Sequence, residues 1–366
     1  MSEHDKTPFP WHLGVFDAHC HPTDTLSSLS DIPSMKARVL TVMATRAQDQ
    51  DLVTQAADDL AKVDYLQHFH RCGIVPSFGW HPWFSHQLYD EKQYDNAIAL
   101  SPSQKTHHYQ SVLTPPPSEA FISSLPAPRR LSSYLSSARQ SLIAHPHALL
   151  GEIGLDRGFR LPEPWDPSSQ SERDEGLTPG GREGRRLSPH RVTIEHQRLV
   201  LQAQLRLAGE LQRAVSVHGV QAHGLLHDAL EESWGGPVAK QKRKAFAGED
   251  GKGGEKLPFP PRVCLHSYSG PPDTVKQYLR PGVPVEIFFS FSIAINFQPP
   301  TARVEDAIRA VPDDRVLVES DLHTAGERMD AMLEDIVRKI CELKEWGLED
   351  GVQRLRDNWK RFVLGT

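Results

Sequence analysis

Short apolar runs alternate with longer amphipathic stretches along this chain, a pattern typical of parallel strands linked by helices. Between residues 191 and 213, for example, Val192, Leu199, Ala203 and Leu207 recur at helical spacing. The pattern predicts eight strands, at 14–17, 38–43, 73–78, 148–153, 214–217, 262–265, 285–289 and 316–318, and helices at 46–71, 191–213, 221–232, 271–280, 301–311 and 326–345. Eight such units predict an α/β fold, a (β/α)8 TIM barrel with long loop insertions.

Three segments interrupt this alternation. Residues 85–135 are rich in Ser and Pro, 158–190 in Gly, Arg and Ser, and 232–260 in Gly and Lys, so we expect flexible insertions there. Without them 253 of the 366 residues remain, close to the roughly 250 residues of a plain barrel. The prediction is therefore one hydrolase domain over 1–366, and the alternative is two domains that divide near 158–190.

Composition narrows the class of protein. The formal net charge of -6 argues against a broad cationic surface for duplex DNA. The four cysteines form no CxxC pair, and no apolar run approaches the roughly 20 residues of a membrane span. The first residues lack the layout of a signal peptide. We expect no membrane partner and a cytoplasmic location, with the nucleus as the alternative.

Histidines and carboxylates follow five of the predicted strands. In a barrel, the carboxyl ends of the strands meet at the face where active sites form. His19 and His21 are two residues apart on an extended chain and so point to the same side. The full set of candidate metal ligands is His19, His21, Glu152, His218, His266 and Asp321.

Each candidate also has an ordinary structural explanation. An isolated His-x-His pair is weak evidence, Glu152 could pair with Arg157, and a single histidine after a strand is usually a core residue. Their convergence at one mouth favours a metal site instead. The mixed ligand set suits one or two divalent ions, Zn2+, Mn2+ or Mg2+, with Glu152 as the bridge between two.

The motifs around these residues resemble those of the TatD family of metal-dependent deoxyribonucleases, in the amidohydrolase superfamily, and its fungal branch with insertions. The resemblance rests on Asp17 to His21, Gly79-Trp80-His81-Pro82, Gly151 to Asp156, the helix with Gln197 and Gln204, His266 to Gly270, and Glu319-Ser320-Asp321. It implies that His19, His21, Glu152 and Asp321 hold one metal, and that Glu152, His218 and His266 hold the second. It also implies that Asp321 accepts a proton from the attacking water and that His81 steers the phosphate or the leaving group. The other explanation of His81 is a loop histidine that caps the turn before Pro82.

Three positions depart from the family pattern. Val220 stands where the family commonly has an arginine, Trp83 where it has a second histidine, and His323 where it has a proline. These departures leave the metal ligands intact but affect the expected substrate preference.

The sequence is compatible with three functions. The first is a nuclease or phosphodiesterase acting on DNA or another phosphoester. The second is an amide or lactone hydrolase, which the sequence disfavours because many such enzymes use a carbamylated lysine where this chain has Glu152. The third is a barrel scaffold that binds a partner protein through its insertions, with weak or no catalysis.

Overall fold

Parallel strands form the centre of the computed structural model, which describes residues 7–60, 72–165, 173–235, 258–298 and 302–366. Each of the eight predicted strands overlaps one of them. They are β1 (Phe16–Cys20), β2 (Val39–Ala44), β3 (Gly73–Phe78), β7 (Leu150–Asp156), β9 (Val215–Val220), β10 (Arg262–Leu265), β11 (Glu286–Phe291) and β12 (Val316–Val318). Their side chains are almost all buried on both faces, as parallel strands between helices require.

The strands follow one another in space as they do along the chain. One ladder has the order β1-β2-β3 and the other β12-β11-β10-β9-β7. Between the ladders, Phe78 donates its backbone N–H to the Leu149 carbonyl at 3.0 Å. At the other junction, the Asp321 N–H donates to the His19 carbonyl at 3.0 Å. The order therefore returns from β12 to β1, as in the predicted barrel.

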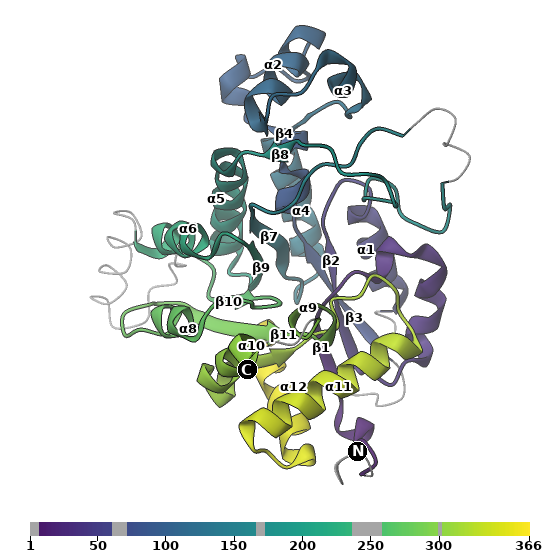
Figure 1. Cartoon of the computed structure of the whole chain (residues 1–366), viewed down its shortest axis with the longest axis vertical. Helices are drawn as coiled ribbons and strands as arrows, with labels where there is room; N and C mark the ends of the chain where they lie inside the picture. Colours follow the sequence, from purple (N-terminus) through teal and green to yellow (C-terminus); the bar gives the residue numbers. More distant parts are fainter. Residues whose placement is uncertain (1–6, 61–71, 166–172, 236–257, 299–301) are drawn as a thin grey trace.

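Helices surround the strands (Figure 1). The predicted helices are confirmed where the structure describes them, and residues 61–71 of the first lie outside the described residues. The predicted helices correspond to α1 (Gln50–Leu60), α5 (Ile194–Leu211), α6 (His223–Gly235), α8 (Pro272–Tyr278), α10 (Ala302–Ala310) and α11 (Glu327–Lys344). Besides two helices within segment 85–135, the sequence did not predict α4 (Leu131–Ala144), the short α9 (Ile293–Asn296) and α12 (Leu348–Leu364).

Helix α12 closes the barrel at the amino ends of the strands. Trp359 and Phe362 are fully buried there, in one cluster with Phe16 and Val39, the first residues of β1 and β2. The Trp359 indole N–H donates to the Thr41 hydroxyl at 3.0 Å. The opposite, carboxyl end of the barrel is left for the site.

Segment 85–135, where the sequence predicts a flexible insertion, contains regular secondary structure. It contains α2 (Pro102–Val112) and α3 (Glu119–Ser124), here called the helical lobe, and the start of α4. In Figure 1 the lobe lies at the end of the molecule away from α11 and α12. The short strands β4 (Leu88–Tyr89), β5 (Leu113–Thr114), β6 (Arg129–Arg130) and β8 (Arg191–Val192) adjoin it.

The lobe folds because it packs around a small core that is separate from the barrel core, and because its helices have well-formed starts. Tyr109, Leu113, Phe121 and Ile122 pack with one another and with two residues from outside the lobe. Ser101 caps α2 in a reciprocal capping box with Gln104. The Ser and Pro content that suggested a loop therefore marks helix ends instead.

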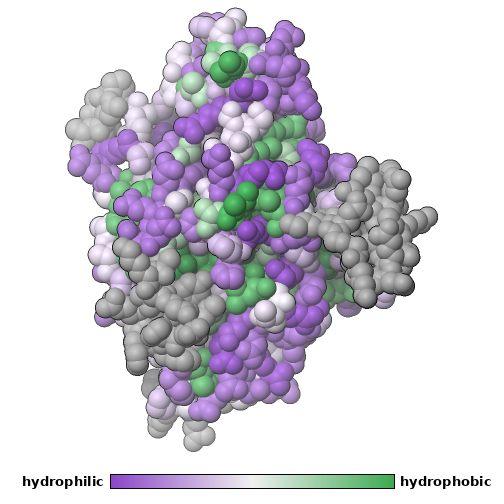
Figure 2. Space-filling model, turned by 180° about the vertical axis from the view of Figure 1, so that it is seen from behind, coloured by the Kyte–Doolittle hydropathy of each residue, from purple (hydrophilic) through white to green (hydrophobic). Residues whose placement is uncertain are grey.

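The other two insertions are described in part. Residues 236–257 of the predicted insertion 232–260 lie outside the described residues, as do 166–172 of the insertion 158–190. Among the described residues no helix is long and apolar enough to cross a membrane. On the face shown in Figure 2, hydrophilic residues predominate and the hydrophobic ones form small patches.

Two buried histidines, one beside the lobe and one within α2, should make the stability of the protein depend on pH. His86 and His108 donate to backbone carbonyls at 3.0 and 2.8 Å, and burial lowers their pKa values to about 3 and about 4. Between these values and about 6.5 the unfolded chain binds more protons, so their stabilisation is present above pH 6.5 and is lost as pH falls. We expect each histidine to lower the free energy of unfolding by about 2 kcal/mol at pH 5 relative to pH 7.5.

Urea denaturation of the wild type and of a His86→Asn, His108→Gln double variant at both pH values tests this. The amides replace the donating ring nitrogens without titrating. The variant should lose less stability between pH 7.5 and 5 than the wild type, and an equal loss in both proteins would contradict the prediction.

Candidate metal centre

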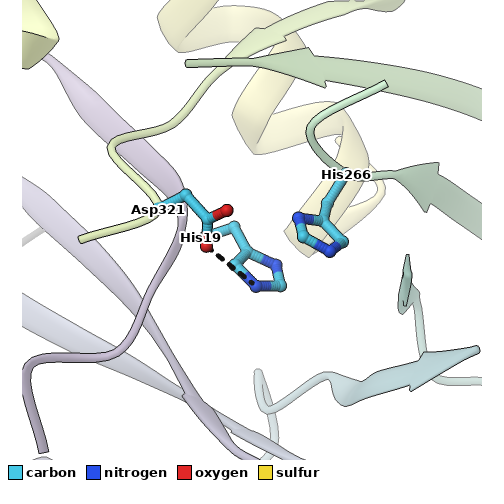
Figure 3. Close-up of side chains that lie close together, drawn as sticks. All are labelled: His19, His266 and Asp321. Atoms are coloured by element: carbon cyan, nitrogen blue, oxygen red, sulfur yellow. Dashed lines mark ion pairs between the residues drawn. The ribbon is translucent and has the colours of Figure 1, made fainter. Parts of the chain in front are cut away.

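All six predicted ligands meet at the carboxyl end of the barrel. His19 and His21 lie at the end of β1, Glu152 within β7, and His218 within β9, whereas the others follow β10 and β12. The five His and Glu side chains are at most 9 % exposed and that of Asp321 is 12 % exposed. Figure 3 shows His19, His266 and Asp321, which come from three elements and face a common point.

The two carboxylate oxygens of Glu152 face two different groups of histidines. Its Oε1 lies 2.7 Å from both His218 Nδ1 and His266 Nε2. Its Oε2 lies 3.4 Å from His19 Nε2 and 3.3 Å from His21 Nε2. One carboxylate thus lies between two pairs of imidazoles, which is the arrangement expected of a ligand shared by two ions.

Asp321 completes the group around Glu152 Oε2. Its Oδ1 lies 3.5 Å from His21 Nε2 and 3.9 Å from His19 Nε2. Its backbone is in the left-handed region, with φ 52°, which Asp tolerates better than most residues. The carboxylate therefore faces the histidines instead of capping the following turn, and it is more exposed than that of Glu152.

The donor set fits a divalent cation. The facing nitrogens of His19 and His21 are 3.1 Å apart, and those of His218 and His266 are 3.2 Å apart. Two imidazoles bound to one tetrahedral zinc at the usual bond lengths would have nitrogens about 3.3 Å apart. Nitrogens this close, with a carboxylate oxygen beside each pair, form clusters that could hold a metal ion.

The carboxylates of the site stay ionised. Burial raises the pKa of Glu152, but electrostatic interactions with the surrounding histidines lower it well below its usual range. Burial likewise opposes ionisation of Asp321, and the hydrogen bond with His21 and nearby histidine charges hold its pKa below the usual range. Two carboxylates that keep their negative charge in a buried site favour a bound cation.

The structure adds residues that orient the ligands and that the sequence did not single out. The Ser216 hydroxyl lies 2.8 Å from His19 Nδ1, and Asp156 Oδ2 lies 3.0 Å from His218 Nε2. In each case the partner fixes the ring, so the other nitrogen faces Glu152. Asp156 was quoted only as part of a motif, and the signal for its role was its carboxylate in an apolar strand.

His81 caps the turn that begins at Pro82, and its other ring nitrogen contacts Glu152. Its Nδ1 accepts from the Trp83 backbone N–H at 3.2 Å, which caps the turn. The proton is then on Nε2, which donates to Glu152 at 3.0 Å. Burial lowers the pKa of His81 to about 4, so it stays neutral at pH 7 and donates without carrying a charge.

A cavity of about 550 Å3 opens above the ligands, the size of a typical small-molecule site. Part of its wall comes from insertion 158–190, including Leu177, Thr178 and Arg182. This wall is attached to the barrel: Arg46 donates to the Pro179 carbonyl at 3.0 Å, and the Thr178 N–H to the Asp24 carbonyl at 2.9 Å.

The three departures from the family pattern all line this cavity. Val220 contributes an apolar side chain that is 36 % exposed. His323 Nδ1 lies 2.7 Å from Asp24 Oδ2, and Trp83 donates to Asp156 at 2.5 Å. Arg46 also lines the cavity, but its charge is neutralised by ion pairs with Asp24 and Asp49.

A parallel barrel with histidines and carboxylates at the carboxyl ends of its strands defines a hydrolase of the amidohydrolase type. The model of the family described as TatD related DNase matches residues 16–363. The chain therefore belongs to the TatD family.

Two fungal relatives share much of the sequence. The chain is 39 % identical over 360 residues to the Cut9-interacting protein scn1 of Schizosaccharomyces pombe. The alignment covers 96 % of this chain and 99 % of the relative. It is 29 % identical over 317 residues to an uncharacterized deoxyribonuclease of Saccharomyces cerevisiae, covering 84 % of this chain and 83 % of the relative.

Solved structures confirm the fold class. A TatD homologue of Escherichia coli, YJJV, aligns with a TM-score of 0.52 at 17 % sequence identity. The alignment covers 96 % of this chain and 98 % of the YJJV chain. An uncharacterized amidohydrolase of Saccharomyces cerevisiae gives a TM-score of 0.58 at 12 % identity, covering 97 % and 100 %. Both likenesses concern the fold alone.

Proposed function

We propose that this protein is a divalent-metal-dependent phosphodiesterase that hydrolyses DNA. The observation that carries the proposal is the position of Glu152, whose two oxygens each face a separate pair of histidines. Membership of the TatD family, and a relative named as a deoxyribonuclease, support DNA as the substrate.

The ligands fall into two groups around Glu152. His19, His21 and Asp321 would hold one ion with Glu152 Oε2, and His218 and His266 the second with Oε1. Bound divalent ions would make an attacking water more acidic and polarise the phosphoester.

The remaining steps belong to side chains of the cavity. Asp321, the more exposed carboxylate, orients the attacking water and accepts its proton. His81 holds Glu152 through its Nε2 proton and, from the cavity wall, steers the phosphate or the leaving group.

Metal analysis of the purified protein, combined with hydrolysis assays on single- and double-stranded DNA in Mg2+, Mn2+ and Zn2+, tests this function. We expect bound metal and hydrolysis that stops on chelation and returns when metal is added back. Protein that holds two ions but cleaves neither form of DNA would refute the nuclease.

A second candidate is partner binding, because the relative that is 39 % identical is named as a Cut9-interacting protein. The helical lobe, which follows the 83 % exposed Ile98 along the chain, offers a surface for such a partner. Co-purification of the chain with the protein that corresponds to Cut9 in its own organism tests this. Binding that persists in an Asp321→Asn variant would separate it from catalysis.

We further infer that residues 1–366 act as one unit, because insertion 158–190 supplies part of the cavity wall. Both candidate functions are consistent with the cytoplasm, and the nuclease also with the nucleus. Fractionation of cells that express the tagged chain tests the compartment.

A further inference from the structure

The cavity lining includes apolar side chains, although the ligands beneath it are polar. Among the described exposed large hydrophobic residues, Val220 and Ile295 both line this cavity, and Ile295 is 51 % exposed. Single exposed apolar residues are normal, but a group of them around a concave site indicates a ligand with an apolar part. The apolar residues of the cavity lining are Trp83, Phe84, Phe159, Pro162, Leu177, Val220 and Ile295.

Two aromatic rings of the lining are stacked. The rings of Trp83 and Phe159 lie 4.2 Å apart between centroids, and their planes are inclined by only 10°. Neither residue is fully buried. Trp83 follows β3, whereas Phe159 belongs to insertion 158–190, so the pair joins the barrel to the insertion.

A single carboxylate positions both rings and a predicted metal ligand. Asp156 Oδ2 accepts from the Trp83 indole N–H at 2.5 Å and lies 3.0 Å from His218 Nε2. Its Oδ1 accepts from the Phe159 backbone N–H at 2.9 Å. The aromatic pair is therefore held at a defined place relative to the metal centre.

We propose that the Trp83–Phe159 pair is a subsite for the nucleobase next to the phosphate that the metal centre binds. This proposal rests on the proposed function and names its substrate class, a phosphoester that carries a flat aromatic base. A base laid on the exposed side of the pair extends the stack, and such contacts are tolerant of base identity. Val220, which stands where the family commonly has an arginine, adds another apolar side chain to the lining of the same cavity.

Calorimetric titration of the metal-loaded protein with thymidine 5′-monophosphate and with methyl phosphate tests the subsite. Both ligands carry a phosphate monoester, and only the first carries a base. We expect the wild type to bind the nucleotide about tenfold more tightly or better, the scale of one base stacked on an aromatic side chain. A wild type without this preference would overturn the proposal.

Variants at Phe159 separate stacking from packing. Phe159→Leu keeps an apolar side chain without a flat ring and should lose most of the preference, whereas Phe159→Tyr should keep it. Arg186→Ala, an exposed change in the same insertion, is the matched control and should leave the preference unchanged. A preference that survives in Phe159→Leu would also overturn the subsite.

The binding measurement does not require turnover, so the two proposals can fail separately. If the wild type prefers the nucleotide but hydrolyses no DNA, the nuclease is wrong and the subsite stands. If it hydrolyses DNA without any preference for the nucleotide, the subsite is wrong and the nuclease stands.

Discussion

Replacing Glu152 with alanine is expected to lower the occupancy of both metal positions at once. The side chain offers one oxygen to each pair of histidines, so its removal takes a ligand and a negative charge from both. Loss of even an outer partner of a metal ligand typically costs 10–100-fold in affinity, and a shared ligand should cost at least about 100-fold. Elemental analysis after dialysis against limiting metal measures the effect.

Glu210→Ala is the matched control for this experiment, because Glu210 is a half-exposed surface residue that pairs only with Arg139 among the described residues. Exposed pairs of this kind contribute little to stability. The control should retain the metal content of the wild type. Normal metal content in Glu152→Ala would rule out a carboxylate shared by two ions.

The Asp321→Asn variant should fold normally and lose on the order of 10²-fold or more in hydrolysis rate, the scale of a lost general base. Asparagine keeps the shape and one donor oxygen, and it tolerates the left-handed backbone found at this position. What it loses is the negative charge that accepts the proton. The rate of metal-dependent DNA hydrolysis and the melting temperature should be measured on the same preparation.

Asp273→Asn, at an exposed position on α8, controls for the substitution itself and should leave the rate unchanged. If Asp321 had only a structural role, the rate would stay near the wild-type value and the melting temperature would fall. That result would exclude Asp321 as the base.

The strands and ligands could be predicted because their signals are local. A parallel strand buried on both faces is visible in the sequence as a largely apolar run, and a polar residue near its end is easily recognised. His218, which follows Val215 to Val217, is an example. The convergence of the ligands then follows from barrel geometry, since all strands point the same way.

The features that were missed depend on contacts between distant segments. Asp156 becomes important only because His218, Trp83 and the Phe159 backbone come to it in the folded chain. The lobe is hard to predict because its helices are short and its core is shared with Leu161 and Val192. The spacing of Ser101 and Gln104, which form a capping box, is the local sign of a helix in this segment.

The position of α12 has a consequence for synthesis of the chain. Trp359 and Phe362 fill the amino-terminal end of the barrel beside Phe16 and Val39, which the ribosome makes more than 300 residues earlier. The inward side chains at the start of the first two strands are therefore covered only after α12 has been synthesised and has packed against them. Nascent chains that stall before residue 359 expose this apolar end, and they should be the species that chaperones hold and that aggregate first.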